Sequence, residues 1–242
     1  MYSVSDLYNT IIAGNDHWFE TKVEINGVSY GETSIMSSIA SYRVFSEEQP
    51  TVGGCLAAEL ELVILAPAVT IPRMAEVKPY VRVVNETQTS EWIPQGIFYI
   101  DTREVTHNDS GLDILTLHCY DAMLKAEADY QDSSIGYPHT TGYVVRVIAK
   151  AMGLQSSTSV WDGIDSRTQT LLTNTPYTIG LPIGFSMRET LGNIAAMYCG
   201  NWIMTYDGKL RLVSLAELPE ETNYLVDNQY DAITFGGDRI LV

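Results

Sequence analysis

Residues 185–213 read FSMRETLGNIAAMYCGNWIMTYDGKLRLV, and this stretch predicts a complete folding unit of one helix followed by a hairpin. Ser186 stands three residues before Glu189. This is the spacing of a capping box, in which the two side chains satisfy backbone N–H groups of the first helical turn. We therefore expect a helix to begin at or near Met187. Its apolar residues recur at helical spacing and predict one buried face, formed by Met187, Leu191, Ile194, Ala195 and Tyr198.

The second half of the same stretch predicts a β-hairpin. Gly200 can adopt the left-handed conformation that ends a helix, and after it the apolar period changes to two. Asp207-Gly208 fits a two-residue turn, and residues 209–213 form the returning strand. One side of the first strand is expected to carry Trp202, Met204 and Tyr206.

The N-terminal half reads as β-structure after a short helix over residues 3–13, which has a serine cap and Gly14 as its stop. Residues 18–30, WFETKVEINGVSY, contain Asn26-Gly27, the strongest short signal for a hairpin. Turn clusters separate the further strand-like segments, which cover residues 35–46, 55–65, 80–85, 92–108 and 112–124. Short strands at this spacing predict a closed or nearly closed barrel, or a sandwich.

Around Tyr120 the composition becomes helix-like, and a second helical stripe over residues 143–152 is closed by Gly153. A Ser/Thr-rich stretch over residues 155–178 is expected to be mostly loop. The predicted fold class is therefore α+β. A mostly antiparallel, barrel-like β-domain covers residues 1–128, and a small α/β domain with two helices and a β-hairpin covers residues 129–215. Residues 216–242 are expected to form a β segment that returns to the first domain or leads into a distal one.

The charge argues against nucleic-acid binding. The 242 residues include 30 acidic and 14 basic side chains, a formal net charge of −16, whereas grooves that grip phosphates are built from Lys and Arg. An acidic wall repels DNA and leaves a passing polymer mobile, although acidity can also serve solubility alone. No run of about 20 apolar residues predicts a membrane span. The first residues do not have the pattern of a signal peptide.

The cysteines and histidines do not form a recognisable reactive site. The three cysteines, Cys55, Cys119 and Cys199, are an odd number and each lies in apolar sequence, so reduced thiols packed in a core are expected, as for a protein made in a reducing cytoplasm. His118-Cys119 with Asp121 does not have zinc-ligand spacing, because neighbours on a strand point to opposite faces. Surface or packed roles are expected for the remaining histidines, His17, His107 and His139.

No catalytic, cofactor-binding or metal-binding residue is assigned, and no cofactor is expected. The sequence has no G-x-S-x-G, H-E-x-x-H or phosphate-loop motif. Trp92 and Trp202 alternate with apolar residues and are expected in the core, whereas Trp161 lies in a polar loop and is expected to be exposed. Asn85-Glu86-Thr87 matches a glycosylation acceptor, but this match has no meaning without export. A chain of this size without a reaction centre favours a structural protein, not an enzyme.

Three segments carry a resemblance to a known family. They are TKVEINGVSYG (21–31), IPQGIFYIDTREVTHNDSGLDILTLHCYDAMLKAEADY (93–130) and the helix-hairpin stretch 185–213. Over residues 20–215, the chain resembles the baseplate hub, or tail-associated tail-tip hub, proteins of long-tailed bacteriophages, prophages and related contractile particles.

The resemblance implies a virion structural protein that links the tail tube to the tip and forms part of the channel for DNA or the tape-measure protein. It implies a trimeric ring in which each subunit contributes two tube-like domains, with the small α/β domain at the periphery as a brace. Expected partners are other copies, the tail tube, a distal tail protein and the tape measure, with DNA only as a passing polymer. Only one tube-like domain is found here, so the second is expected beyond Val242.

We further predict that acidic residues are enriched on the channel-facing side of the β-domain, because repulsion of phosphates lowers friction. Two other functions remain open. A carbohydrate-binding module for host recognition would be favoured by exposed aromatic residues clustered around Trp161 and by binding to cell-wall glycans. A cell-wall hydrolase would need two carboxylates that face each other, one of them with a raised pKa.

Overall fold

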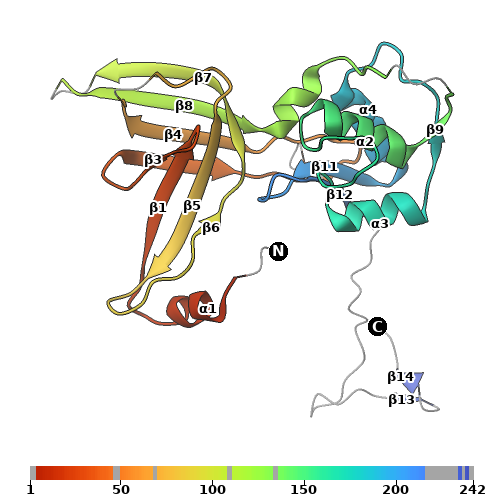
Figure 1. Ribbon diagram of the computed structural model, residues 1–242. Coiled ribbons are helices and arrows are strands. Elements are labelled where there is room, and N and C mark those ends of the chain that lie inside the picture. Colours follow the sequence, from red (N-terminus) through yellow and green to blue (C-terminus); the bar gives the residue numbers. More distant parts are fainter. Residues whose placement is uncertain are drawn as a thin grey trace.

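A computed structural model describes residues 4–45, 50–67, 70–107, 111–132 and 136–215, together with the backbone of 234–235 and 238–239. Residues 4–121 form a sheet part and residues 122–215 a helical part, which lie side by side in Figure 1. The elements of the sheet part are α1 (Asp6–Ile12), β1 (Trp18–Ile25), β2 (Val28–Tyr30), β3 (Ile35–Ser41), β4 (Glu59–Leu65), β5 (Glu76–Val84), β6 (Ile93–Pro94), β7 (Phe98–His107) and β8 (Asp113–Asp121).

The strands form one antiparallel sheet in the order β2-β1-β5-β7-β8-β4-β3, with β6 paired to β5. The predicted closure into a barrel is not observed among the described residues, because β2 and β3 end the sheet and do not pair with each other. The physical reason lies between β5 and β7, where only Glu76 pairs with Tyr99 and Val77 with Phe98. Beyond these pairs the β1–β5 ribbon diverges steeply from β7, as Figure 1 shows, and the sheet remains open.

The hairpin predicted at Asn26-Gly27 is confirmed. Both residues have positive φ, 50° and 81°, which is the backbone that a tight two-residue β-turn requires. Ile25 therefore pairs with Val28, and the register continues to Val23 and Tyr30. The predicted N-terminal helix is also confirmed, as α1 with Ser5 at its N-cap.

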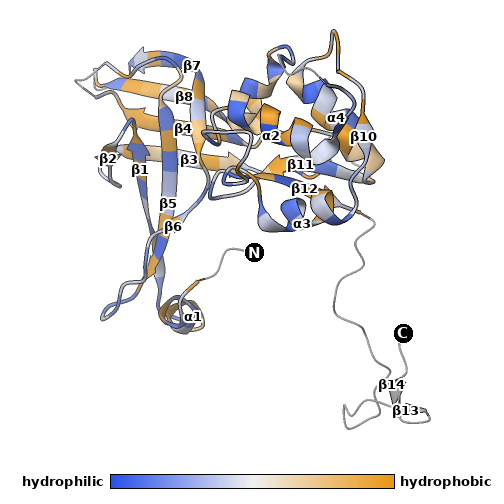
Figure 2. Ribbon diagram, turned by 45° about the vertical axis from the view of Figure 1, so that its right-hand side comes forward, coloured by the Kyte–Doolittle hydropathy of each residue, from blue (hydrophilic) through white to orange (hydrophobic). Residues whose placement is uncertain are grey.

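The sheet buries one face. Alternation along each strand places apolar side chains on that face, and Figure 2 shows the same alternation as orange and blue bands. This core includes Val23, Ile25, Leu60, Leu62, Ile64, Val77, Phe98, Ile100, Leu115, Leu117 and Cys119. The opposite face of the same strands is available to solvent or to a partner.

The helical part has its own core. Its elements are η1 (Ala122–Glu127), β9 (His139–Thr140), α2 (Thr141–Ala151), α3 (Ser166–Asn174), β10 (Thr178–Ile179), α4 (Met187–Met197), β11 (Gly200–Met204) and β12 (Leu210–Ser214). The capping box of Ser186 and Glu189 is present, and the five residues predicted to form the buried face of α4 are buried. The indole N–H of Trp202 donates to the carbonyl of Leu191 at 2.7 Å, which fixes the hairpin beneath the helix.

Three predictions for this part are wrong in detail. The stretch predicted as loop contains α3, which has Asp165 as its N-cap. Only Thr168 and Leu172 of this helix are buried, so its apolar period is too weak to predict a helix. The helical part therefore has three α-helices and not two. The left-handed residue that ends α4 is Cys199, with φ of 51°, and not Gly200. The hairpin loop spans residues 205–209, because the hydroxyl of Thr205 caps it by accepting from the N–H of Lys209.

A segment of the sheet part pairs with the hairpin of the helical part. Residues 53–56 run parallel to β11, with Gly53 N–H donating to Gly200 and Leu56 N–H donating to Trp202. A Cβ on Gly192 would lie 2.7 Å from the carbonyl oxygen of Gly53, so α4 can approach the segment only because that residue is glycine. The two parts are therefore joined by strand pairing as well as by the covalent chain.

Asn201 completes this junction. Its side chain is fully buried, its oxygen accepts from Gly54 N–H at 2.7 Å, and its amide donates to the carbonyls of Val44 and Thr51 at 2.9 and 2.6 Å. One side chain of the hairpin thus satisfies three backbone groups of the segment that leads into β4. These three hydrogen bonds tie the hairpin to that segment.

The segment predicted over residues 216–242 lies outside the described residues, apart from the backbone of β13 (Thr234–Phe235) and β14 (Asp238–Arg239), which pair with each other. The prediction that this segment returns to the first domain stays a prediction.

Asn201→Ala is expected to lower the free energy of unfolding by about 2–4 kcal/mol, because it removes three hydrogen bonds at the junction together with a fully buried side chain. Urea denaturation followed by tryptophan fluorescence measures the change. Asn193→Ala on the exposed side of α4 is the matched control and is expected to change stability by less than about 0.5 kcal/mol. Equal effects of the two substitutions would show that Asn201 does not hold the junction.

Candidate functional site: an acidic sheet face

The solvent face of strands β3, β4, β8 and β7 is the strongest candidate for a functional surface. Cross-strand register places Ile39 beside Glu61 on β4, and Glu61 beside His118 on β8. In the next row, Glu59 lies beside Tyr120. We call this surface the acidic face, and it consists of Ser37, Ile39, Ser41, Glu59, Glu61, Val63, Tyr99, Thr102, Glu104, Thr116, His118 and Tyr120.

The charge of the acidic face is not neutralised by these strands. Glu59, Glu61 and Glu104 are exposed, and none of the ion pairs among the described residues involves them. The four strands contain a single Lys or Arg, Arg103, which pairs across β8 with buried Leu117. The guanidinium of Arg103 donates to the carbonyl of Ile71 on the other side of the sheet. The face therefore presents negative potential to whatever lies in front of it.

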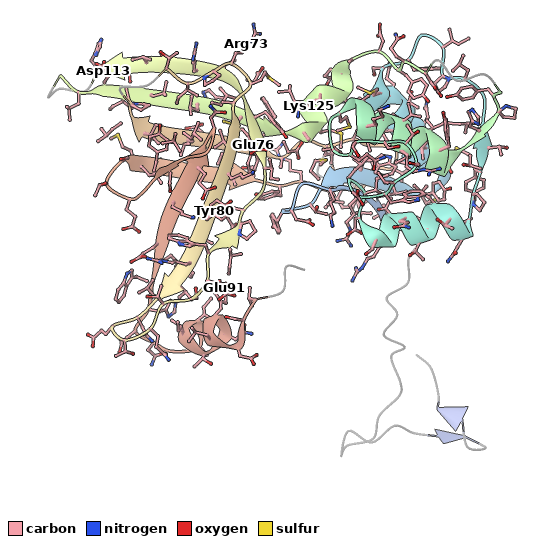
Figure 3. All side chains as sticks on the ribbon, in the orientation of Figure 1. Arg73, Glu76, Tyr80, Glu91, Asp113 and Lys125 are labelled. Carbon is pink, nitrogen blue, oxygen red and sulfur yellow. The ribbon has the colours of Figure 1, made fainter. Side chains whose placement is uncertain are left out.

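The β1–β5 ribbon is different, because its carboxylates are paired. Glu20 contacts Arg82 at 2.5 Å, Lys22 contacts Glu24 at 3.0 Å, and Glu76 contacts Lys78 at 2.5 Å. Figure 3 labels two residues of this surface on β5, Glu76 and Tyr80. The first pair joins neighbouring strands and the other two lie within one strand, and together they cancel most of the field of this ribbon. Within the strands of this sheet, the exposed carboxylates without an ion pair therefore lie on β4 and β7 and not on β1 or β5, although other exposed carboxylates, such as Asp16 and Glu86, lie in the loops.

Trp92 belongs to the charged surface of the ribbon. It was predicted to be a core residue, but it is only half-buried. The guanidinium of Arg82 lies 4.3 Å and the ammonium of Lys22 lies 5.2 Å from its ring centre. Both cations therefore use the indole face that a ligand would need.

A cleft of about 340 Å³ lies at the end of the acidic face, where the sheet part meets the helical part. Figure 3 labels Lys125 at this junction, and its ammonium lies 3.6 Å from the ring centre of Tyr99. Arg188 on α4 donates to the carbonyls of Cys55 and Met123 and pairs with Glu127 at 2.8 Å, so its charge is used to hold the junction. Residues of the cleft are Arg43, Cys55, Leu56, Ala57, Glu59, Tyr120, Leu124, Glu127 and Arg188.

The ionisable groups beside the cleft have structural environments. Burial raises the pKa of the Cys55 thiol to about 12, so the thiol is neutral at pH 7 and is not an activated nucleophile. Burial also raises the pKa of Asp121 to about 6. Its two carboxylate oxygens accept from Ala58 N–H at 2.7 Å and Met123 N–H at 2.8 Å. Asp121 therefore caps η1 and ties it to the segment before β4, and this arrangement is that of a helix cap rather than of a general acid.

The structure separates the residues that the sequence had placed next to one another. His118 is exposed on the acidic face and Cys119 is buried behind it, as the strand argument predicted. No group of three or more possible metal ligands occurs within the described residues. His107 pairs with Asp113 at 2.6 Å on an exposed strand end, and His139 lies between the rings of Tyr137 and Tyr143.

Besides Trp92, two further residues were predicted in the wrong environment. Trp161 is half-buried and not exposed, because its ring packs against Gly142 and lies 4.8 Å from the guanidinium of Arg146. Trp161 is therefore not one of the exposed aromatic residues that would favour the carbohydrate-binding hypothesis. Cys199 is exposed at the end of α4 and is not packed in the core like Cys55 and Cys119.

Sequence reasoning predicted an acidic surface but could not identify its carboxylates. The available signal was the strand ELELVIL at residues 59–65, in which Glu59 and Glu61 alternate with buried leucines. Only the register shows that Glu104 shares their face, because the bulge between Ile100 and Thr102 reverses the side of every following residue on β7. In the described part of the chain, no helix has the length and apolar character to cross a bilayer.

Comparison with known proteins identifies the fold. No family model and no curated protein matches the chain. Among solved structures, the 43 kDa tail protein of prophage MuSo2 from Shewanella oneidensis aligns with a TM-score of 0.50 and 13% identity over 86% of this chain. The alignment covers 59% of the Shewanella protein, so this chain spans less than two thirds of its length. At this identity the likeness shows a shared fold.

Two further structures are similar at lower scores. A tail protein from Neisseria meningitidis MC58 aligns with a TM-score of 0.49 and 14% identity, over 84% of this chain and 53% of that one. A chain of the lidded Francisella PdpA-VgrG complex aligns with a TM-score of 0.47 and 7% identity, over 88% of this chain and 30% of that one.

The raised pKa of Asp121 predicts a specific pH dependence. A pKa above the unfolded value means that the carboxyl contributes most stability below about pH 4, and that this contribution is lost as the pH rises through 6. The free energy of unfolding of the wild type minus that of Asp121→Asn is expected to fall by about 2 kcal/mol from pH 4 to pH 7, because the contribution is not yet complete at pH 4. Chemical denaturation of both proteins at each pH measures it. A difference that does not change with pH would contradict the shift.

Proposed function

We propose that the chain is a structural component of a phage or prophage tail, in the baseplate or tail-tip hub that links the tail tube to the tip. The observation that carries the proposal is the acidic face, one side of an open antiparallel sheet on which Glu59, Glu61 and Glu104 are exposed and form no ion pair. The shared fold with a prophage tail protein and the resemblance in residues 21–31, 93–130 and 185–213 support the same function. The role is mechanical, and no catalysis is proposed.

In this proposal the acidic face lines a channel. DNA carries a phosphate charge about every 1.7 Å of duplex length, so a wall whose strands carry exposed carboxylates and a single Arg disfavours its capture. Lys125 and Arg43 lie only at the end of this wall, beside Tyr99 and in the cleft. The paired charges of the β1–β5 ribbon suit a surface that contacts protein, because a neutral pattern does not repel neighbouring subunits. DNA is then a passing polymer, and a tape-measure protein can occupy the same channel before it.

The sheet part and the helical part are proposed to act as two domains, near the boundary expected at residue 128. Each has its own hydrophobic core, and the pairing of residues 53–56 with β11 makes the helical part a brace on the sheet. Residues 216–242 are proposed to continue the chain towards a second tube-like domain or to return to the first. The protein would be made in the bacterial cytoplasm and reside in the virion tail or a related particle.

The ring requires contact between copies, and β3 is the sheet edge that supports it. Native edge strands are commonly protected by short length, charge or proline. β2 is three residues long, and the outer half of β7 carries the charged residues Arg103 and Glu104. β3 is seven residues long and uncharged, and its Ile39 is 57% exposed. We propose that a neighbouring copy in a trimeric ring pairs with this edge. The other proposed partners are the tail-tube, distal tail and tape-measure proteins.

Light scattering over a wide concentration range tests the ring. The wild type is expected to reach three times the 26.9 kDa chain mass as concentration rises. Ile39→Lys is expected to raise the concentration needed for assembly at least about tenfold, because lysine on an edge strand opposes strand addition. Ile183→Lys, at an exposed isoleucine in the helical part, is the control and should assemble like the wild type. A monomer at every concentration would overturn the ring for this chain.

A charge reversal tests the channel. Replacing Glu59, Glu61 and Glu104 by lysine is expected to make the protein retain duplex DNA in a gel-shift assay at about 0.05 M salt, where the wild type does not. The control replaces Asp16, Glu86 and Asp162 by lysine. These three residues are exposed outside the acidic face, so the control makes the same change in net charge. Retention by the first variant alone supports the proposal. Equal retention by both variants would show that total charge, and not the acidic face, keeps DNA unbound.

A further inference from the structure

The loop that joins α3 to α4 through β10 exposes an unusual amount of apolar surface. We call residues 175–185 the apolar loop. Its Ile183 is 78% exposed, and Tyr177, Leu181 and Phe185 are each more than 40% exposed. Figure 2 shows strongly hydrophobic colouring on the chain beside β10, at the side of the helical part away from the sheet. Clustered apolar side chains on a soluble protein mark a binding surface more often than scattered ones do.

The apolar loop is held in its exposed position by the fold. β10 pairs with β9 through Thr178 with Thr140 and Ile179 with His139. The N–H of Tyr130 donates to the carbonyl of Phe185 at 2.9 Å. Pro182 is buried beneath the exposed residues. A binding surface that is already ordered loses little conformational entropy when it is covered.

The apolar loop has no charge of its own and a negative border. No charged residue occurs between Asn174 and Met187 in a chain that has 44 charged residues. At its C-terminal end, Glu189 accepts from Ser186 N–H at 2.7 Å, and the hydrogen bonds of Ser186 lower the pKa of that carboxyl. Asp129 is exposed and pairs with Ser186 through its backbone. The neighbouring cation, Arg188, is turned towards Glu127 and the junction.

We propose that the apolar loop binds a protein segment in which apolar residues are flanked by lysine or arginine. Apolar side chains of such a segment would cover Ile183, and its cations would face the carboxylates of Asp129 and Glu189. Charge selects this occupant over two others. A second copy would bring the same two carboxylates to the contact, and an anionic membrane would be repelled by a chain of net charge −16. The inference goes beyond the tail function and does not depend on it.

Two short synthetic peptides test the proposal. They share a Leu/Ile/Phe centre and carry either lysines or glutamates at both ends. At about 0.15 M salt, the lysine-flanked peptide is expected to bind the wild type at least about tenfold more tightly than it binds Ile183→Ser, as measured by fluorescence anisotropy. Val105→Ser is the matched control, because Val105 is 56% exposed on β7 and should bind the peptide like the wild type. Circular dichroism and urea midpoints verify that each variant is folded.

Each other outcome overturns the proposal. Equal binding of the lysine-flanked peptide to the wild type and Ile183→Ser would mean that net charge alone attracts it. Equal binding of the glutamate-flanked peptide would remove the need for cations. Absence of binding would exclude this class of partner. If Ile183→Ser lost self-association, the loop would instead bind a second copy. If it lost binding to phosphatidylglycerol vesicles, the loop would instead bind a membrane. Ile39→Lys should bind the peptide normally, so failure of the ring and failure of this inference are distinguishable.

Discussion

The architecture depends on a parallel pairing between residues 53–56 and β11, in which Gly54 and Asn201 are 147 positions apart in the chain. The backbone hydrogen bonds of Gly53 and Leu56, the three contacts of Asn201 and the close approach at Gly192 all act at this place. The last strand pair of the helical part thus holds the segment that enters β4. Because β4 lies at the centre of the acidic face, the position of the helical part and the orientation of that face are coupled.

The same alternation in the strands produces the core and the functional surface. Leu60 and Leu62 face the hydrophobic core, while Glu59 and Glu61 on the same strand face outward. A strand register that shifted by one residue would bury the carboxylates and expose the leucines. Stability and charge distribution are therefore not independent in this protein, since selection for a packed core also fixes which side of the sheet is acidic.

Local signals in the sequence were reliable where the interactions that determine the structure are local. The capping box of α4 and the Asn26-Gly27 turn involve residues at most three apart, and both were predicted correctly. Prediction was wrong where distant packing decides the outcome. α3 has a polar composition and is stabilised through contacts such as the hydroxyl of Thr168, which accepts from Leu212 N–H. Trp161 was expected to be exposed because its neighbours are polar, but its ring packs on α2.

The sequence by itself determined the α+β class, the individual strands with their apolar alternation, the two capped helices and the excess of negative charge. These properties follow from side-chain chemistry and from interactions across a few residues. Only the tertiary structure decided that β2 and β3 end the described sheet without pairing with each other, and which carboxylates share a face. The physical reason is that strand pairing and bulges join residues far apart in the chain, so their register depends on the packing of the whole molecule.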